Sequence, residues 1–311
     1  MAERACLRDA FGRELQQLGR ERSDLVVLDG DLADATNTGL FGNEFPDRYF
    51  DMGISEQDMM GTAAGLASCG KLPLAATFAV FAAMRACEQV RTSICYPRLN
   101  VKIVATHSGL SAGPTGPSHQ GTEDLAIMRA LPNMTVLSPA DAPSTRAALR
   151  AMLAHDGPVY MRLPRAPLPV LHAGPLALSI GRAITLRDGT DVALIATGVM
   201  VGRALEAAAA LQPLGVQARV IDMHTIKPID DETVVRAARE TGRIVTLEDH
   251  NILGGLGGAV AEAVTQRQPV PVLRLGVPDC YGWVGSHDEL LDRAGLGVPT
   301  IVARVRDFCG R

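Results

Sequence analysis

The chain has few aromatic residues and no long uninterrupted apolar run. Seven Phe, four Tyr and one Trp make up 4% of its 311 residues. No apolar run approaches the roughly 20 residues that a membrane-spanning helix requires, so we expect no membrane partner. The opening stretch MAERACLRDAFGREL is charged and amphipathic, and it lacks the apolar core of a signal peptide.

The chain also lacks two other features, an excess of basic residues and closely spaced pairs of cysteines. The formal net charge is −4, which argues against nucleic acid as a main partner, because phosphate backbones require a basic face. The six cysteines form no C-x-x-C pair. We therefore expect reduced core cysteines in a reducing cytoplasm and no structural zinc site.

What is present indicates a globular α/β protein of two domains. Hydrophobic residues make up 47% of the chain and charged residues 21%, and the length suits two cores. Short β-rich runs such as DLVVLDG, KLPLAATF and NVKIVATH alternate with helical stretches, for which we predict residues 56–68, 82–94 and 144–154. This alternation predicts doubly wound, mostly parallel sheets.

The composition of the sequence changes near residue 165. Four prolines fall between residues 163 and 175, which predicts a connector, and a second alternating block follows. We place the first domain at residues 1–165, a linker at 166–188 and the second domain at 189–311. The glycine-rich GGLGGAV lacks the later acid of a dinucleotide fingerprint, so we expect it to let a helix pack closely on the second sheet.

Glu56 lies where an extended segment meets a small-residue helix, in DMGISEQDMMGTAAG. One interpretation is structural: Ser55 serves as the N-cap, and acids in the first turn suit the helix dipole. The other is chemical. A carboxyl group beside Met59, Met60 and the small residues that follow would sit in a dry pocket that a flat ring could approach, and such a pocket raises a carboxyl pKa.

The neighbouring motifs favour the chemical interpretation. In order along the chain they are VVLDGDLADAT, YFDMGISEQDMMGTAAGLA, TFAVFAAMRACEQVR, THSGL…GPSHQG, EDLAIMRALPNMTVLSPAD and EDHNILGGLGGAV. On these motifs the sequence resembles the transketolase family of thiamine-diphosphate enzymes, over the pyrimidine-binding domain and the C-terminal domain. The resemblance covers nearly the whole chain.

The resemblance implies roles for residues near the cofactor. Glu56 would hydrogen-bond the pyrimidine ring, which favours the imino form of the 4′-amino group that removes the thiazolium C2 proton. Phe78 and Phe81 would contact the pyrimidine ring. Asp31 would lie near the cofactor and a subunit contact.

The resemblance also implies substrate-binding residues. His107 and His119, in one Gly/Pro-rich loop, would bind the ketose and move protons. Between them, Pro114 and Thr115 replace the acidic pair usual in the family, so we expect Thr115 to face the sugar with a neutral hydroxyl. An arginine after the strand GPVYMRL would hold the sugar phosphate; the candidates are Arg165, Arg162 and, from the first helix, Arg8.

A metal-binding half is missing. Thiamine diphosphate needs a divalent cation held by hard oxygen ligands, and GDLADATN is not followed by the expected Asn-Asn pair. We therefore expect the C-terminal section of a split transketolase. Its partner would be an N-terminal subunit that carries Mg²⁺ or a similar cation and the diphosphate, two copies of each chain assembling.

The leading hypothesis is a subunit that moves a two-carbon ketol unit from a ketose phosphate to an aldose phosphate. Four alternatives stay open. They are the same chemistry on an unusual ketose, a 2-oxoacid dehydrogenase beta subunit, a half resembling deoxyxylulose-phosphate synthase, and a non-catalytic assembly subunit. No residue of the second domain receives a chemical role.

Overall fold

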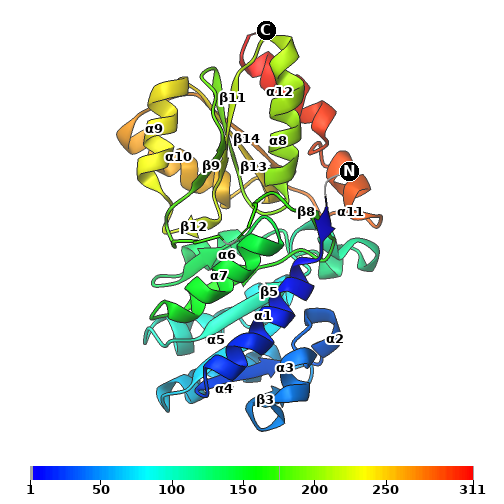
Figure 1. Ribbon diagram of the computed structural model, residues 1–311, viewed down its shortest axis with the longest axis vertical. Coiled ribbons are helices and arrows are strands. Elements are labelled where there is room, and N and C mark those ends of the chain that lie inside the picture. The colour runs from blue at the N-terminus through cyan, green and yellow to red at the C-terminus, as the bar shows by residue number, and fades with distance from the viewer. Residues whose placement is uncertain (1–2, 175, 311) are drawn as a thin grey trace.

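The molecule is an α/β protein with two helix-covered sheets arranged along its long axis (Figure 1). The computed structural model describes residues 3–174 and 176–310. Both main sheets are mostly parallel. The predicted fold class is therefore confirmed.

The first sheet has seven strands in the order β12-β6-β7-β5-β4-β2-β3. All neighbours are parallel except β12 and β6. The strands are β2 (Leu25–Asp29), β3 (Tyr49–Asp51), β4 (Leu72–Phe78), β5 (Lys102–Thr106), β6 (Thr135–Leu137), β7 (Val159–Arg162) and β12 (Thr225–Lys227). Strands β2, β4 and β5 are buried along their whole length, as continuous apolar runs between two helical layers should be.

Helices cover both faces of this sheet. They are α1 (Leu7–Glu21), α2 (Ala33–Thr36), α3 (Gly39–Glu44), α4 (Glu56–Ser68), α5 (Cys87–Gln89), α6 (Asp124–Ala130) and α7 (Ala142–Ala154), with short turns η1 (Pro46–Arg48), η4 (Leu110–Thr115) and η5 (Pro117–His119). Helices α1 and α7 lie side by side (Figure 1). Leu7, Phe11, Leu15 and Leu18 of α1 are buried at helical spacing, and each such side chain contributes about 1.5–3 kcal/mol.

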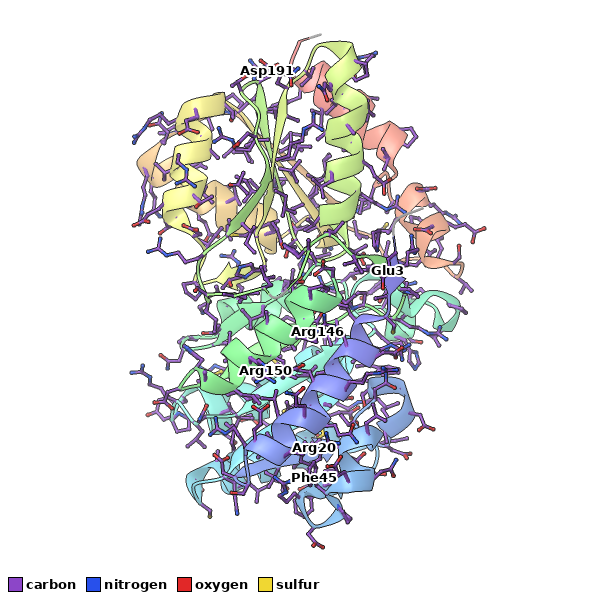
Figure 2. All side chains as sticks on the ribbon, in the orientation of Figure 1. Glu3, Arg20, Phe45, Arg146, Arg150 and Asp191 are labelled. Atoms are coloured by element: carbon purple, nitrogen blue, oxygen red, sulfur yellow. The ribbon has the colours of Figure 1, made fainter. Side chains whose placement is uncertain are left out.

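A surface ion pair adds to the α1–α7 contact. Arg150 of α7, labelled in Figure 2, donates to Glu21 of α1 at 3.1 Å between Nη1 and Oε2. Both side chains are 44% exposed, so the pair contributes at most about 1 kcal/mol. Arg150 also forms an ion pair with Glu14 of α1, which is nearly buried. Apolar packing and these ion pairs together join the two helices.

The helix predicted at residues 82–94 is interrupted. Two π-helical segments, η2 (Phe81–Arg85) and η3 (Val90–Cys95), flank the short α5. In η2 the N–H of Ala86 reaches the carbonyl of Phe81, five residues back, at 3.3 Å. A wider turn of this kind often marks a functional site, and η2 carries Phe81 and Arg85.

The second sheet has five strands in the order β14-β13-β10-β11-β9, of which only the edge strand β9 is antiparallel to its neighbour in the described residues. The strands are β9 (Ile184–Arg187), β10 (Val192–Ala196), β11 (Ala218–Asp222), β13 (Ile244–Asn251) and β14 (Val272–Val277). The helices are α8 (Met200–Leu211), α9 (Asp231–Thr241), α10 (Leu256–Arg267), α11 (His287–Arg293) and α12 (Val298–Phe308), with the turn η6 (Gln212–Leu214).

The glycines of GGLGGAV allow close packing of α10 on this sheet. A Cβ at Gly257 would lie 2.9 Å from Thr246 Oγ1 and from Arg274 Cδ. The buried carboxylate of Glu248 accepts the N–H groups of Leu256 and Gly257 at the start of α10. The stretch is thus a packing motif, as its sequence predicts.

The segment predicted as a linker, 166–188, is built into both halves. Its first part forms β8 (Leu168–Pro169), which pairs with β1 (Arg4–Ala5). Its last part is β9, which pairs with β11. Beyond it, β12 crosses back from the second half and pairs with β6 of the first sheet.

Buried charges also join the two halves. Asp141, the N-cap of α7, lies 3.1 Å from His172 Nδ1, and Asp222 at the end of β11 lies 3.5 Å from Nε2 of the same ring. Burial opposes the charged ring, but the two carboxylates outweigh it and raise the pKa of His172. Burial raises the pKa of Asp222 to about 7, although His172 opposes this.

The cysteine prediction is wrong in one respect. All six cysteines are free thiols, but only Cys95 is buried, whereas Cys69 and Cys280 are exposed. Apolar neighbours in the sequence do not guarantee that a cysteine is buried when it lies at a helix end, as Cys69 does, or in a loop, as Cys280 does. Among residues 3–174 and 176–310, no helix combines the length and the apolar character needed to cross a bilayer.

Candidate active site

Glu56 begins α4 at the joint that the sequence indicates. Its residue surface is 1% exposed. Its Oε2 accepts a hydrogen bond from Arg85 Nη1 at 2.7 Å, and its Oε1 lies 3.5 Å from Thr77 Oγ1. Ser55 occupies the N-cap position, but its hydroxyl donates to the Met52 carbonyl at 2.6 Å and does not cap the helix. The buried position of this carboxyl thus does not come from a capping role.

The residues that follow Glu56 on α4 are partly buried and partly exposed, and its ion-pair partner is Arg85. Met59, Met60 and Ala63 are fully buried. Gly61, which we expected beside a ring, is exposed, and a Cβ there would meet no atom within 4 Å. The guanidinium of Arg85 contacts the carboxylate as an ion-pair partner that the sequence interpretation did not include.

Arg85 is a functional candidate that sequence reasoning missed. Its Cζ lies 4.3 Å from the centroid of the Phe81 ring, a cation–π distance. Its side chain is 44% exposed, against 1% for Glu56. The usable signal was its spacing, because Arg85 follows Phe81 by four residues on a helical segment and so shares its face.

Two phenylalanines connect this carboxylate to the histidine loop. Phe78 ends β4 and stacks on His107 with ring centroids 3.9 Å apart. Phe81 lies 6.0 Å from Phe78 and 5.4 Å from His119, in an edge-on arrangement with the latter. The structure therefore brings Glu56, both phenylalanines and both histidines into one contiguous cluster.

His107 follows β5 in a left-handed backbone conformation, with φ of 57°. Its Nδ1 lies 3.0 Å from Thr106 Oγ1. Burial lowers the pKa of His107 to about 3, and the positive charges of Arg8, Arg165 and His119 act in the same direction. The ring is thus neutral near pH 7. His119 lies in η5, where its Nδ1 is 2.9 Å from Ser118 Oγ.

The loop between the histidines is held by the second half of the chain. Leu110 N–H donates to Asp249 Oδ1 at 3.0 Å, and His287 Nε2 lies 3.2 Å from Asp249 Oδ2. Burial acts to raise the pKa of Asp249, but the hydrogen bond from His287 and nearby positive charge bring it below its ordinary value. Because 139 residues separate Asp249 from Leu110, no local sequence pattern predicts this contact.

A cavity of about 320 Å³ opens beside this loop. Arg8 of α1 and Arg165 after β7 both line it, together with Ser111, Gly113, Pro114 and His287. The backbone N–H of Arg165 donates to Ser111 Oγ at 3.0 Å, which ties the arginine to the loop. Two guanidinium groups at one cavity suit an anionic group.

Arg162 does not lie at this cavity. It is 4% exposed, forms an ion pair with Asp124 at 3.0 Å and donates to the carbonyls of Asp249 and Gly121. Its donors thus serve the contact between the two halves. The sequence interpretation of Arg162 as a surface arginine or a phosphate ligand is therefore wrong, because it misses a tertiary contact.

Two other predicted residues lie at the surface. Thr115 is exposed, and its hydroxyl donates to the Ala112 carbonyl at 2.8 Å within η4. Asp31 is exposed with φ of 61°, and its backbone N–H donates to Asp51 Oδ1 at 3.2 Å. In residues 3–174 and 176–310, no three His, Cys, Asp or Glu side chains are grouped so that they could hold a metal ion.

Comparisons with known proteins agree with this layout. The model of the transketolase pyrimidine-binding domain matches residues 4–170, and that of the transketolase C-terminal domain matches residues 181–301. A protein of Methanocaldococcus jannaschii named "Putative transketolase C-terminal section" is 44% identical over 97% of this chain and 95% of its own. The 6-deoxy-6-sulfo-D-fructose transketolase subunit SqwH of Clostridium sp. is 42% identical over 98% and 95%.

A solved structure gives the same result in three dimensions. It is described as "Split gene transketolase, inactive beta4 tetramer", with a TM-score of 0.88 and 48% identity over 97% of both chains. The family models together span most of the chain. This chain therefore belongs to the transketolase family and corresponds to the section that carries the pyrimidine-binding and C-terminal domains.

Proposed function

We propose that this chain is the pyrimidine-binding subunit of a split, thiamine-diphosphate-dependent transketolase. Joined to a partner chain, it would move a two-carbon ketol unit from a ketose phosphate to an aldose phosphate. The observation that carries the proposal is the contiguous cluster of a buried Glu56, Phe78, Phe81, His107 and His119.

The residues at Glu56 fit the pyrimidine end of the cofactor. When bound, thiamine diphosphate supplies a group that stabilises negative charge as a carbon–carbon bond breaks. Among the residues that the structure describes, Glu56 Oε1 has a hydrogen-bond contact with Thr77 at 3.5 Å alone, and it would hydrogen-bond a ring nitrogen. Phe78 and Phe81 would orient the flat ring by aromatic contact. Arg85 would stay on Oε2 and hold the carboxylate in place.

The two histidines would serve the sugar. His107 is neutral near pH 7 because its pKa is about 3, so it would hydrogen-bond the ketose carbonyl or a hydroxyl without adding charge. His119 lies at the loop edge, in contact with Phe81 and partly open to solvent. It would pass protons to and from substrate oxygens.

The acidic end of the substrate would lie at the cavity of Arg8 and Arg165. The loop that carries His107 lines this cavity through Ser111, Gly113 and Pro114. Thr115 would contact a sugar hydroxyl, which requires its side chain to turn from Ala112. Asp31, on the exposed turn after β2, would lie near the partner chain.

The diphosphate and its cation would be held by a partner. We propose an N-terminal transketolase subunit that binds Mg²⁺ or a similar cation, in an assembly of two plus two chains. The related structure described as an inactive β4 tetramer supports this proposal, because its name joins a split gene, self-association and inactivity. Solvent-exposed Ile54 and Met84, close in sequence to Glu56 and Arg85, would be covered in such an assembly.

The test is reconstitution with a candidate N-terminal subunit. Thiamine diphosphate with Mg²⁺ is titrated into each chain alone and into the pair, followed by a ketol-transfer assay. We expect tight binding and turnover only for the pair. Full turnover by this chain alone would contradict the proposal.

A matched pair of variants tests the carboxyl group. Glu56→Ala should abolish turnover while the two chains still co-purify. Asp58→Ala, which removes an exposed acid from the same helical turn, should keep it. Unchanged turnover in Glu56→Ala would favour a non-catalytic assembly subunit.

A second candidate keeps the chemistry and changes the donor. Pro114 and Thr115 replace an acidic pair at the loop, and a relative 42% identical is named for 6-deoxy-6-sulfo-D-fructose. A panel of phosphorylated, sulfonated and branched ketoses, tested on the reconstituted pair, separates the candidates. A donor range equal to that of an ordinary transketolase would remove the argument from Thr115.

A further inference from the structure

His287 places a side chain of the second half at the substrate cavity. It begins α11 and lines the cavity with Arg8 and Arg165. Its side chain is 9% exposed, and that of Asp249 beside it is 5% exposed. A buried imidazole at a cavity with two arginines calls for an explanation beyond packing.

The ring of His287 is fixed in orientation. Its Nε2 lies 3.2 Å from Asp249 Oδ2, and the Asp249 carboxylate accepts because it has no proton to donate. The same carboxylate accepts the Leu110 N–H at 3.0 Å, so it positions both the ring and the loop. In the described part of the chain, the hydrogen bonds of this ring use Nε2, which leaves Nδ1 for a ligand.

We propose that His287 is a third recognition group for the acidic end of the ketose, next to Arg8 and Arg165. The proposal rests on the function proposed above and deepens it. The shared ligand chemistry is a tetrahedral anionic head with three terminal oxygens, a phosphate ester or a sulfonate. An anionic oxygen of the ligand would accept a hydrogen bond from Nδ1–H, while Nε2 stays against Asp249. Two guanidinium groups and one imidazole ring would then meet the three oxygens.

The arrangement gives the second half a part in substrate choice. The α11 segment also touches the loop through its neighbours, since a Cβ at Gly113 would lie 3.1 Å from the Gly285 carbonyl. Gln120 Nε2 donates to the Trp283 carbonyl at 2.8 Å. A change in the position of α11 would therefore change the cavity and the loop together.

Binding of simple anions to the purified chain gives the first test. Inorganic phosphate and methanesulfonate are titrated calorimetrically into the unchanged chain and into His287→Asn and His287→Gln. A lost charged hydrogen bond predicts a roughly tenfold rise in the dissociation constant of the preferred anion. His155→Gln, at a half-buried histidine on another loop, is the control and should bind like the unchanged chain.

Kinetics of the reconstituted complex give the second test. The His287 variants should raise KM for fructose 6-phosphate, or for 6-deoxy-6-sulfofructose, about tenfold with little change in kcat. KM for unphosphorylated fructose should not change. Asp249→Asn should also raise the ratio of KM for the acidic donor to KM for fructose, because the ring of His287 would be held less firmly.

The outcomes separate the two proposals. No ketol transfer with any donor would overturn the proposed function, whatever the anion titrations show. Normal transfer with an unchanged ratio of KM values, and unchanged anion binding in both His287 variants, would overturn the role of His287 alone. Thermal unfolding of each variant confirms that it is folded before the comparison.

Discussion

At the scale of single residues, the pairing of Glu56 with Arg85 is the most informative contact. A carboxylate with 1% of its side chain exposed costs several kcal/mol when it has no partner. Arg85 compensates it from the solvent side, at 2.7 Å. The same arginine stacks on Phe81. It therefore fixes two residues of the cluster at once.

Arg85→Ala should lower the free energy of unfolding of the isolated chain by about 1–2 kcal/mol. The value lies below that for a fully buried pair because Arg85 is 44% exposed. Chemical denaturation at pH 7 measures it. Arg91→Ala, at an exposed arginine of the next helical segment, should change stability by less than about 0.5 kcal/mol.

A double-mutant cycle isolates the pair. When Glu56→Gln is already present, removing Arg85 should cost much less than in the unchanged chain, because no buried charge is left to compensate. Equal costs in both backgrounds would contradict the pairing described here.

The lowered pKa of His107 predicts that the chain loses stability on acidification. Its pKa is about 3 in the folded chain because of burial and nearby positive charges, against an ordinary value of 6.5. The unfolded chain therefore binds more protons between these values, so this contribution is complete above pH 6.5 and is lost as pH falls toward 3. Unfolding curves at pH 4.5, 5.5 and 7 should show a smaller slope for His107→Gln. An identical slope would show that His107 is not the buried neutral ring described.

Sequence reasoning located residues that sit inside one motif and missed residues that meet across the fold. Glu56, Phe78, His107 and His119 each follow a recognisable strand end, where parallel sheets collect ligands. Arg162 was misassigned because its partner Asp124 and the carbonyl of Asp249 come from other segments. His287 was missed for the same reason, since the role proposed for it depends on contacts with residues far away along the chain.

At the scale of elements, the loop between β5 and α6 is shaped by one carboxylate. Gly109 has φ of 59°, and a Cβ there would lie only 2.2 Å from Asp249 Oδ2. Its N–H donates to the Gly121 carbonyl at 2.9 Å, which closes the loop. The absence of a side chain at residue 109 is what lets β13 approach the loop.

Gly109→Ala should destabilise the chain by about 2–4 kcal/mol and abolish turnover of the complex. The added methyl group displaces Asp249 and also strains a left-handed backbone. Gly70→Ala is the control, because Gly70 has φ of 83° but its Cβ would meet no atom within 4 Å. It should cost only the backbone strain, about 1 kcal/mol. Thermal unfolding of both variants measures the difference, and equal costs would exclude the clash.

Regular elements were the predictable part of the fold. Helix α4 has the predicted bounds, and the buried strands β2, β4 and β5 follow from their apolar runs. Strands β8, β9 and β12 were not predictable, because each is two to four residues long and is defined by a distant partner. The π-helical segments η2 and η3 have no period of their own in the sequence that would have predicted them.

At the scale of the whole molecule, the two halves meet through charges that are buried together. Asp141, His172 and Asp222 come from α7, from the segment after β8 and from β11. The pKa of Asp222 is raised to about 7 by burial. Between pH 3.8 and about 7, the folded chain therefore holds a proton there that the unfolded chain has released.

Asp222→Asn should make the chain more stable than the unchanged one above pH 7. Because the folded pKa of Asp222 is raised, its contribution is complete below pH 3.8 and is lost as pH rises through about 7. The advantage of the variant should grow between pH 5 and 7 by on the order of 1 kcal/mol per pH unit. Guanidinium denaturation at several pH values measures it, and a constant difference would exclude titration of this group.

The crossing of β12 into the first sheet has a consequence for any attempt to divide the molecule. A fragment that stops near residue 170 would lose β12, and the backbone donors and acceptors of β6 would face water along an open margin. Such a fragment would recruit strands from its neighbours and precipitate. The second half of the chain thus completes the first sheet, and a soluble excised first domain would need a substitute for the three residues of β12.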